Sequence, residues 1–218
     1  MGDRAAKDAL FDAFAEVAKA LGNGRRAELI DVLVQGERHV DELAVEIGQS
    51  VANTSFHLRV LATSGLVTTR RDGTRIYYRI ASERVGELWS ALRDVAAAHH
   101  RELDDLAVAY LGDRSRLDEI SRGELVQRLA DGDVVVVDVR PASEYTSGHI
   151  AGARSIPIDD LARQVRSLPE GVEVVAYCRG PYCVFADDAV RLLRRRGRPA
   201  RRLEDGFPEW RAGSLPSG

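Results

Sequence analysis

The sequence predicts two domains of different class: a mainly α-helical domain in residues 1–112 and an α/β domain with a parallel sheet in residues 113–218. Helical runs followed by a single hairpin fill the first part. The second part holds two short β-branched apolar runs, 133–140 and 172–177, which are typical of buried strands. The small, polar segment 113–118 is the expected linker. Each part has the usual length of a domain with its own core.

The first part begins with apolar residues at helical spacing, interrupted by glycines. The predicted helices are 10–21, 25–34, 40–47 and 51–64, with Ser50 as the expected N-cap of the fourth. Two helices joined by a short glycine-containing turn form a helix-turn-helix, which lays its second helix in the major groove of DNA. The third and fourth helices therefore predict a DNA-binding pair.

A hairpin and local positive charge follow this pair. Residues 66–80 are two strand-like runs around Asp72-Gly73, a strong signal for a hairpin that serves as a wing. Residues 50–80 carry five arginines against one acid, net +4, whereas the whole chain has net charge −3. Such local charge favours binding to the phosphates of double-stranded DNA. We expect Val51, Leu58 and Leu61 to face the core. The expected DNA contacts are polar or basic: Ser50, Asn53, Thr54, His57, Arg59, Arg70, Arg71 and Arg75.

The only two cysteines of the chain, Cys178 and Cys183, lie in one turn between the strand-like run 172–177 and the helix-like run 184–196. Amides at a helix N-terminus favour a thiolate and an anion, so we expect Cys178 to ionise near neutrality and act as a nucleophile. Arg179 is expected to bind an anion. The residues expected to shape the loop are Gly180, Pro181 and Tyr182. Cys183 is either a resolving thiol or part of the pocket wall, and the simplest alternative is two cysteines that only pack there.

Three further segments surround this turn in the sequence: Asp133–Arg140, Gly148–Pro157 and Gly206–Trp210. Together with the Cys loop they make residues 117–216 resemble the rhodanese homology domain. The resemblance implies that Cys178 accepts a sulfane sulfur from a small donor as a persulfide and passes it to a thiol acceptor, with no cofactor. It also implies scaffold roles for Asp138, Arg140, His149 and Trp210. Related phosphatases and arsenate reductases use a Cys-x5-Arg loop, but position 184 here is valine, which favours sulfur transfer.

Residues 5–105 resemble the ArsR/SmtB family of winged-helix repressors, through Leu29–Ile80 and above all the stretch SVANTSFHLRVLATSGL at Ser50–Leu66. The resemblance implies a homodimer in which helices 8–21 and 83–110 pack against their symmetry mates, and each protomer reads one half-site of a palindrome. The third helix lacks the cysteines of arsenic and cadmium sensors, so we expect no metal site there. Asp94, His99 and His100 leave zinc as an alternative to two exposed histidines.

Together these patterns predict a DNA-binding regulator, expected to be a repressor, whose second domain senses reactive sulfur at Cys178. Two alternatives remain: a sulfurtransferase tethered to a DNA-binding domain, and a metal-responsive repressor with an inert second domain. The sequence has no apolar stretch of 18 residues and no signal-peptide pattern. We therefore expect a cytoplasmic protein with no membrane partner, and neither a metal nor a cofactor.

Overall fold

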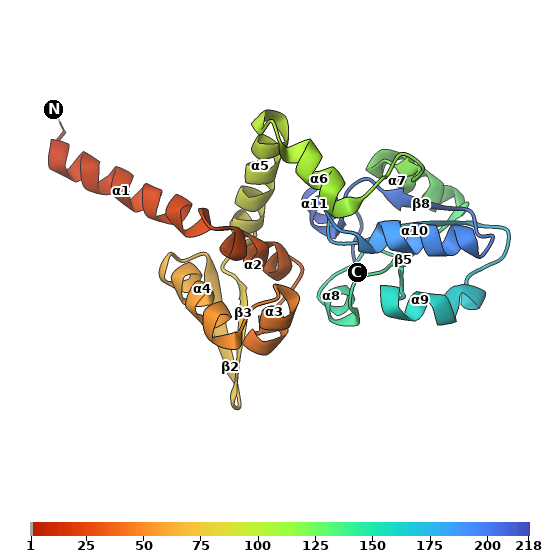
Figure 1. Cartoon of the computed structure of the whole chain (residues 1–218), viewed down its shortest axis with the longest axis horizontal. Coiled ribbons are helices and arrows are strands. Elements are labelled where there is room, and N and C mark those ends of the chain that lie inside the picture. Colours follow the sequence, from red (N-terminus) through yellow and green to blue (C-terminus); the bar gives the residue numbers. More distant parts are fainter. Residues whose placement is uncertain (1) are drawn as a thin grey trace. The chain divides into compact units, whose positions relative to one another are not determined.

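The structure is a computed structural model that describes residues 2–218. The chain forms two compact units, one ending at Val95 and one spanning Ala96–Gly218. The predicted fold class is confirmed: the first unit is mainly helical with a β-hairpin, and the second is α/β with a five-stranded parallel sheet (Figure 1).

In its described residues, the first unit has four helices, most of a fifth that continues into the second unit, and a small antiparallel sheet. The helices are α1 (Arg4–Leu21), α2 (Gly24–Val34), α3 (Val40–Glu46), α4 (Val51–Thr63) and α5 (Glu83–His99), and the strands are β1 (Arg38–His39), β2 (Val67–Asp72) and β3 (Arg75–Ile80). Strand order is β1-β3-β2. Asp72 pairs with Arg75 at the hairpin tip, and Gly73 there takes the positive φ of 59° that favours glycine. β1 was not predicted, because two residues become a strand only by pairing with β3.

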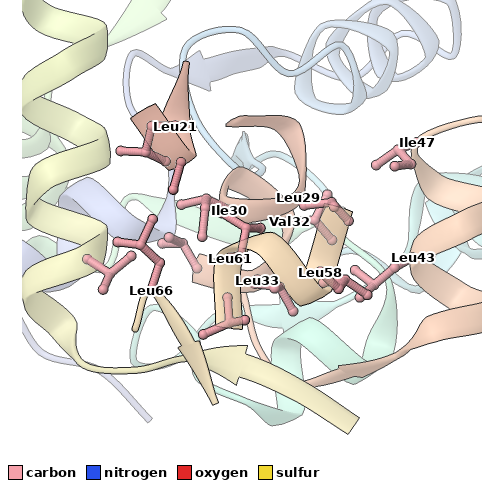
Figure 2. Packing of buried hydrophobic residues seen from close by; sticks show 14 residues of the cluster. Leu21, Leu29, Ile30, Val32, Leu33, Leu43, Ile47, Leu58, Leu61 and Leu66 are labelled. Carbon is pink, nitrogen blue, oxygen red and sulfur yellow. The ribbon is translucent and has the colours of Figure 1, made fainter. Parts of the chain in front are cut away.

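The core of the first unit lies between α2, α3, α4 and the hairpin (Figure 2). Leu58 and Leu61 are fully buried, as predicted. Val51 is not: its side chain is 43% exposed. It is the first residue of α4, and the inward face begins one turn later at Thr54, whose hydroxyl is satisfied by donating to the Ser50 carbonyl at 3.0 Å.

The predicted helix 83–110 is wrong as a single element. α5 ends at His99, and α6 (Leu103–Leu111) begins after a short turn in which the Leu103 amide donates to the His100 carbonyl at 3.1 Å. No glycine or proline marks this break in the sequence. Leu111 at the end of α6 is buried in the second unit. Tertiary packing therefore separates two segments whose sequence reads as one helix.

The second unit is a parallel sheet in the order β4-β8-β7-β5-β6. Its strands are β4 (Glu119–Ile120), β5 (Val134–Asp138), β6 (Arg154–Ser155), β7 (Glu173–Tyr177) and β8 (Ala200–Leu203). Its further helices are α7 (Arg122–Asp131), α8 (Ala142–Thr146), α9 (Ile158–Gln164), the 3-10 turn η1 (Val165–Ser167), α10 (Phe185–Arg195) and α11 (Phe207–Ala212). The predicted start of α7 is confirmed, because the Ser121 hydroxyl accepts from the Glu124 amide at 3.2 Å.

Two cores lie on opposite faces of this sheet. Val174 and Ala176 pack with α9 and α10 on one face, whereas Val175 packs with α7 and α11 on the other. This alternation is the two-residue period of a strand covered on both sides. β7 is the middle strand, so its carboxyl end, where Cys178 follows, lies at the edge where open parallel sheets bind ligands. No helix in the described part of the chain is long and apolar enough to span a bilayer.

Candidate functional site

The exposed N-terminal end of α4 carries two of the predicted DNA contacts. Ser50 is the N-cap, and its hydroxyl accepts from the Asn53 amide at 3.2 Å. The Asn53 side chain donates to Gln49 Oε1 at 2.6 Å. Arg59, two turns further along the helix, is also exposed. These three side chains are open to solvent on the helix that the sequence predicted as the reading helix.

Thr54 and His57, two other predicted contacts on α4, lie on the buried face of the helix. Thr54 is fully buried and His57 is 8% exposed. Both share the inward face of the helix with Leu58 and Leu61, because residues three and four apart lie on one side of a helix. Their predicted place on the exposed face is wrong: the Thr54 hydroxyl has a backbone partner in the core, and His57 is buried although its Nδ1 has no hydrogen-bond partner in the described part of the chain.

The wing presents arginines in two different settings. Arg71 and Arg75 are exposed, and Arg71 Nε donates to the Gly73 carbonyl at 3.1 Å. Arg70 instead holds Glu37 through two hydrogen bonds of 3.2 and 2.6 Å, contacts Asp72 at 3.2 Å, and lies 4.7 Å from the Tyr77 ring centroid. The hydrogen bonds from Glu37 and Asp72 raise the pKa of Arg70 above its usual value. Arg70 therefore braces the wing through contacts within the protein.

The Cys loop, Cys178–Cys183, joins β7 to the N-terminus of α10. Both thiols are free. Cys178 is 1% exposed, and its Sγ lies 3.8 Å from the carbonyl oxygens of Gly180 and Cys183. Cys183 is only partly buried, and its amide donates to the Gly180 carbonyl at 3.2 Å. The loop thus holds one enclosed thiol and one accessible thiol.

The two thiols differ in acidity, and in the direction opposite to the sequence-based expectation. Burial, together with the hydrogen bond and charge of Cys183, raises the pKa of Cys178 well above its usual value. The hydrogen bond from the Cys178 thiol, followed by backbone amides of Arg179 and Phe185, lowers the pKa of Cys183. Cys183 is therefore the more acidic of the two thiols. The helix N-terminus does favour a thiolate, but in this loop ionisation is favoured at the more exposed of the two neighbouring sulfurs.

The Arg179 side chain binds a buried carboxylate. Its guanidinium lies 2.6 to 3.1 Å from Glu144 of α8 and 5.3 Å from the Phe185 ring centroid. Glu144 is fully buried and Arg179 nearly so. The pair anchors the first turn of the Cys loop to α8. Arg179 in this position contributes charge near Cys183 rather than a direct grip on an anion.

The four residues expected to form a scaffold occupy buried or stacked positions. Arg140 and Asp138 are fully buried and form an ion pair of 2.5 Å, and Asp138 also accepts from the Tyr177 hydroxyl at 2.5 Å. His149 stacks on Tyr145 with ring centroids 3.7 Å apart. Trp210 is buried and donates to a backbone carbonyl at 3.0 Å. These contacts hold the segment after β5 against β7 and α11.

Comparisons with known proteins agree with both the helix-turn-helix unit and the α/β unit. Residues 23–69 match the family model of the arsR family of bacterial regulatory proteins, and residues 121–213 match the rhodanese-like domain. The chain is 48% identical over 210 residues to the HTH-type transcriptional regulator Rv0324 of Mycobacterium tuberculosis, covering 96% of this chain and 92% of that protein. The chain belongs to the ArsR family of transcriptional regulators, with a rhodanese-like domain.

Other relatives match the DNA-binding half of this regulator. It is 40% identical over 73 residues to the HTH-type transcriptional regulator KmtR of M. tuberculosis, covering 34% of this chain and 56% of that protein. A solved structure of Mb0332 from Mycobacterium bovis, described as a homodimeric winged helix-turn-helix DNA-binding domain, is 46% identical. That match covers 45% of this chain and 90% of the other, with a TM-score of 0.43.

The histidines considered for zinc lie at the end of α5 in this regulator. Asp94 and His99 are within the helix, and His100 follows it directly. Among residues 2–218, the structure brings together no group of three or more His, Cys, Asp or Glu side chains that could hold a metal ion.

Gly206 contacts the Cys loop, although no local pattern in its segment distinguishes it. A Cβ built at this position would lie 2.3 Å from the Arg179 carbonyl carbon and from the Gly180 amide nitrogen. The next residue, Phe207, donates its amide to the Cys178 carbonyl at 3.1 Å. The N-terminus of α11 thus packs against the backbone of the Cys loop, at a distance that leaves room for no residue larger than glycine.

We expect Gly206→Ala to displace the Cys loop, because both of its closest neighbours are backbone atoms. Overpacking of this kind costs about 1–3 kcal/mol. The free energy of unfolding of the second unit should fall by that amount, and the alkylation rates of both thiols should change. Gly123→Ala is the matched control, since its added Cβ would meet nothing within 4 Å in α7. Unaltered thiol reactivity in a folded Gly206→Ala variant would contradict the supporting role.

Proposed function

We propose that this ArsR-family regulator acts in the cytoplasm as a homodimeric repressor on a palindromic operator. Exposed apolar side chains on two helices support the dimer: Leu10, Phe11 and Phe14 on α1, and Leu88 and Leu92 on α5, are each 43 to 60% exposed. Large apolar side chains gathered on exposed helix faces in this way are typical of an interface. A twofold dimer would present two copies of α4, which is what a palindrome requires.

Within each protomer, the reading surface is the N-terminal end of α4 together with the wing. Ser50, Asn53 and Arg59 are the exposed polar residues of the helix, and Arg71 and Arg75 supply positive charge on the hairpin. The amide and hydroxyl groups suit base edges, whereas arginines suit both guanine and phosphate. Arg70 contributes by fixing the wing to Glu37.

The second domain, in this proposal, accepts sulfane sulfur on Cys178 and so reports reactive sulfur to the DNA-binding half. The observation that carries it is the pair of free thiols at the carboxyl end of the middle strand, of which Cys183 has a lowered pKa. A second thiol with a lowered pKa gives the enclosed Cys178 a base within hydrogen-bond reach.

The transfer from thiosulfate, used here as a representative donor, proceeds in one displacement. The Cys183 thiolate takes the proton of the Cys178 thiol, and the Cys178 sulfur attacks the outer sulfur of thiosulfate. The sulfur–sulfur bond of the donor breaks, and sulfite leaves with the bonding electron pair. The products are the Cys178 persulfide anion, the Cys183 thiol and sulfite.

Two outcomes are then open to the persulfide. An acceptor thiolate that attacks its outer sulfur takes that sulfur and returns the Cys178 thiolate. Alternatively, the Cys183 sulfur attacks the inner sulfur and gives up its thiol proton to the outer sulfur, so that a Cys178–Cys183 disulfide forms and the outer sulfur leaves as hydrosulfide. The second outcome leaves the Cys loop itself in a changed covalent state, the disulfide, as expected of a sensor.

An operator gel-shift series tests this function. Polysulfide treatment is expected to change the operator affinity of the wild type by about 5- to 150-fold, the usual range of coupling between two sites. Cys178→Ser should bind the operator like the untreated wild type and should not respond. Arg75→Gln serves as a control for weakened phosphate contact. Equal affinity in treated and untreated wild type would refute sulfur-responsive regulation.

The same loop also fits a sulfurtransferase, because an acceptor thiol that reaches the persulfide before Cys183 does would regenerate the enzyme. Turnover distinguishes the two functions. We expect about one sulfite per Cys178 from thiosulfate, since Cys183 competes from within the loop. Many turnovers in the presence of a thiol acceptor would favour the enzyme.

A further inference from the structure

The segment between α6 and β4, which the sequence predicts as a linker, is bound along its length to α10. Arg191 donates to the Asp113 carbonyl at 3.2 Å, and Arg194 donates to the Arg116 carbonyl at 2.6 Å. Arg194 also forms an ion pair with Asp118 at 2.7 Å. Within the segment, the Leu117 amide donates to the Arg114 carbonyl at 2.8 Å, closing a turn. This connection is held by α10, the helix whose N-terminus carries the Cys loop.

Arg114 reaches from this segment directly to the Cys loop. Its Nη1 donates to the Pro181 carbonyl at 2.7 Å and its Nη2 to the Cys183 carbonyl at 3.2 Å. Its Nε lies 2.5 Å from a carboxylate oxygen of Asp187, which is fully buried in the first turn of α10. The other oxygen of Asp187 is 3.1 Å from Arg202 of β8. One guanidinium therefore joins the loop and the start of α10.

The Cys183 carbonyl connects this guanidinium to the enclosed thiol. It accepts from Arg114 and lies 3.8 Å from Cys178 Sγ, at the distance of a weak S–H hydrogen bond. Conversion of the Cys178 thiol to a persulfide or disulfide changes the sulfur group that faces this carbonyl, and a disulfide also pulls the Cys183 backbone toward Cys178. Either change alters the carbonyl that Arg114 holds.

An open cavity adjoins both the Cys loop and α6. Its lining includes Pro181 and Tyr182 of the loop, Val108 and Leu111 of α6, and Arg114. The loop therefore borders open space that α6 also borders, whereas its backbone at Arg179 and Gly180 is in close contact with Gly206.

We propose that Arg114 is the positioning residue of the sulfur site and the contact through which the chemical state of the Cys loop reaches α6. This inference rests on the proposed function for the sulfur signal, but the positioning role stands on the contacts alone. Guanidinium is suited to it, because a fixed fork of donors spans two carbonyls and a carboxylate at once, which the single ammonium of lysine does not.

The test compares Arg114→Gln and Arg114→Lys with Arg116→Gln, an exposed arginine two residues further along the same segment. The first readout is the rate of iodoacetamide alkylation at each cysteine at pH 7, resolved by mass spectrometry. We expect Arg114→Gln to slow alkylation of Cys183 by about threefold to tenfold, since loss of nearby positive charge shifts a thiolate equilibrium by up to about one pH unit. Arg114→Lys should fall in between, and Arg116→Gln should match the wild type.

The second readout is operator affinity before and after polysulfide treatment of the full-length dimer. Arg114→Gln is expected to take up sulfur on Cys178 yet lose most of the affinity change, whereas Arg116→Gln keeps it. Full response and wild-type alkylation in Arg114→Gln would overturn the inference while leaving the proposed function intact. If the wild type itself shows no response, the proposed function fails, and the alkylation rates still decide the positioning role. Should Arg114→Gln fail to fold, Arg114→Lys carries the same comparison.

Discussion

Glu144→Gln is expected to destabilise the rhodanese-like domain by about 3–5 kcal/mol, the usual cost of removing one partner from a buried ion pair. Glu144 is fully buried on α8 and holds both Nε and Nη2 of Arg179. The neutral amide leaves the Arg179 charge enclosed without its carboxylate. The start of the Cys loop should loosen as well, because Arg179 directly follows Cys178.

Urea unfolding followed by tryptophan fluorescence measures this loss. The chain has two tryptophans, Trp89 in the first unit and Trp210 in the second. In a Trp89→Phe background, the emission of Trp210 reports the rhodanese-like domain alone. Glu170→Gln, at an exposed carboxylate, is the control and should change stability by less than about 0.5 kcal/mol.

A double variant separates loss of the pair from loss of packing. Replacing both members, as Glu144→Met with Arg179→Met, removes the unpaired charge, so we expect it to recover much of the stability that Glu144→Gln loses. If Glu144→Gln were as stable as Glu170→Gln, the ion pair would not anchor the Cys loop.

Cys183→Ser is expected to remove the first ionisation of the thiol pair, which we call the low-pH ionisation because it occurs below the usual pKa of cysteine. In the wild type, the pair releases its first proton below the usual value for cysteine, because the Cys178 thiol and backbone amides stabilise the Cys183 thiolate. In the variant only Cys178 remains, and burial raises its pKa. The thiolate present at pH 7 should therefore fall. Thiolate ultraviolet absorbance and the pH dependence of alkylation measure it.

Cys178→Ser is the matched comparison for this shift. It keeps the Cys183 thiolate and replaces its thiol donor with a hydroxyl, which donates a hydrogen bond at least as well. The low-pH ionisation should therefore persist. The reverse pattern, in which Cys178→Ser loses that ionisation and Cys183→Ser keeps it, would restore Cys178 as the thiolate that the sequence predicted.

Local patterns in the sequence correctly predicted most of the elements. Helical periodicity and Ser50 located α4, and the Asp72-Gly73 turn located the hairpin. Ser121 located the start of α7. Each of these signals acts over a few residues of continuous chain, so propensity and capping determine them. The separation of α5 from α6 was missed, because nothing local in residues 99–103 disfavours a helix.

The site residues divide in a similar way. The sequence placed both cysteines in one strand-to-helix turn and the basic residues on the wing, because these positions follow from the order of elements. It misplaced Thr54 and His57, since a helical face does not reveal how deep its polar members lie. It also assigned the thiolate to Cys178, because relative burial of two neighbouring sulfurs is a property of the folded loop.

The sequence by itself determined that this chain joins an ArsR-type DNA-binding domain to a rhodanese-like domain with two thiols in one loop. Only the tertiary structure decided which thiol holds the charge, that Arg179 binds Glu144, and that Arg114 and Gly206 contact the loop. The physical reason is distance along the chain. Arg114 and the Cys183 carbonyl it holds are 69 residues apart, and contacts between such distant segments depend on how the whole domain packs.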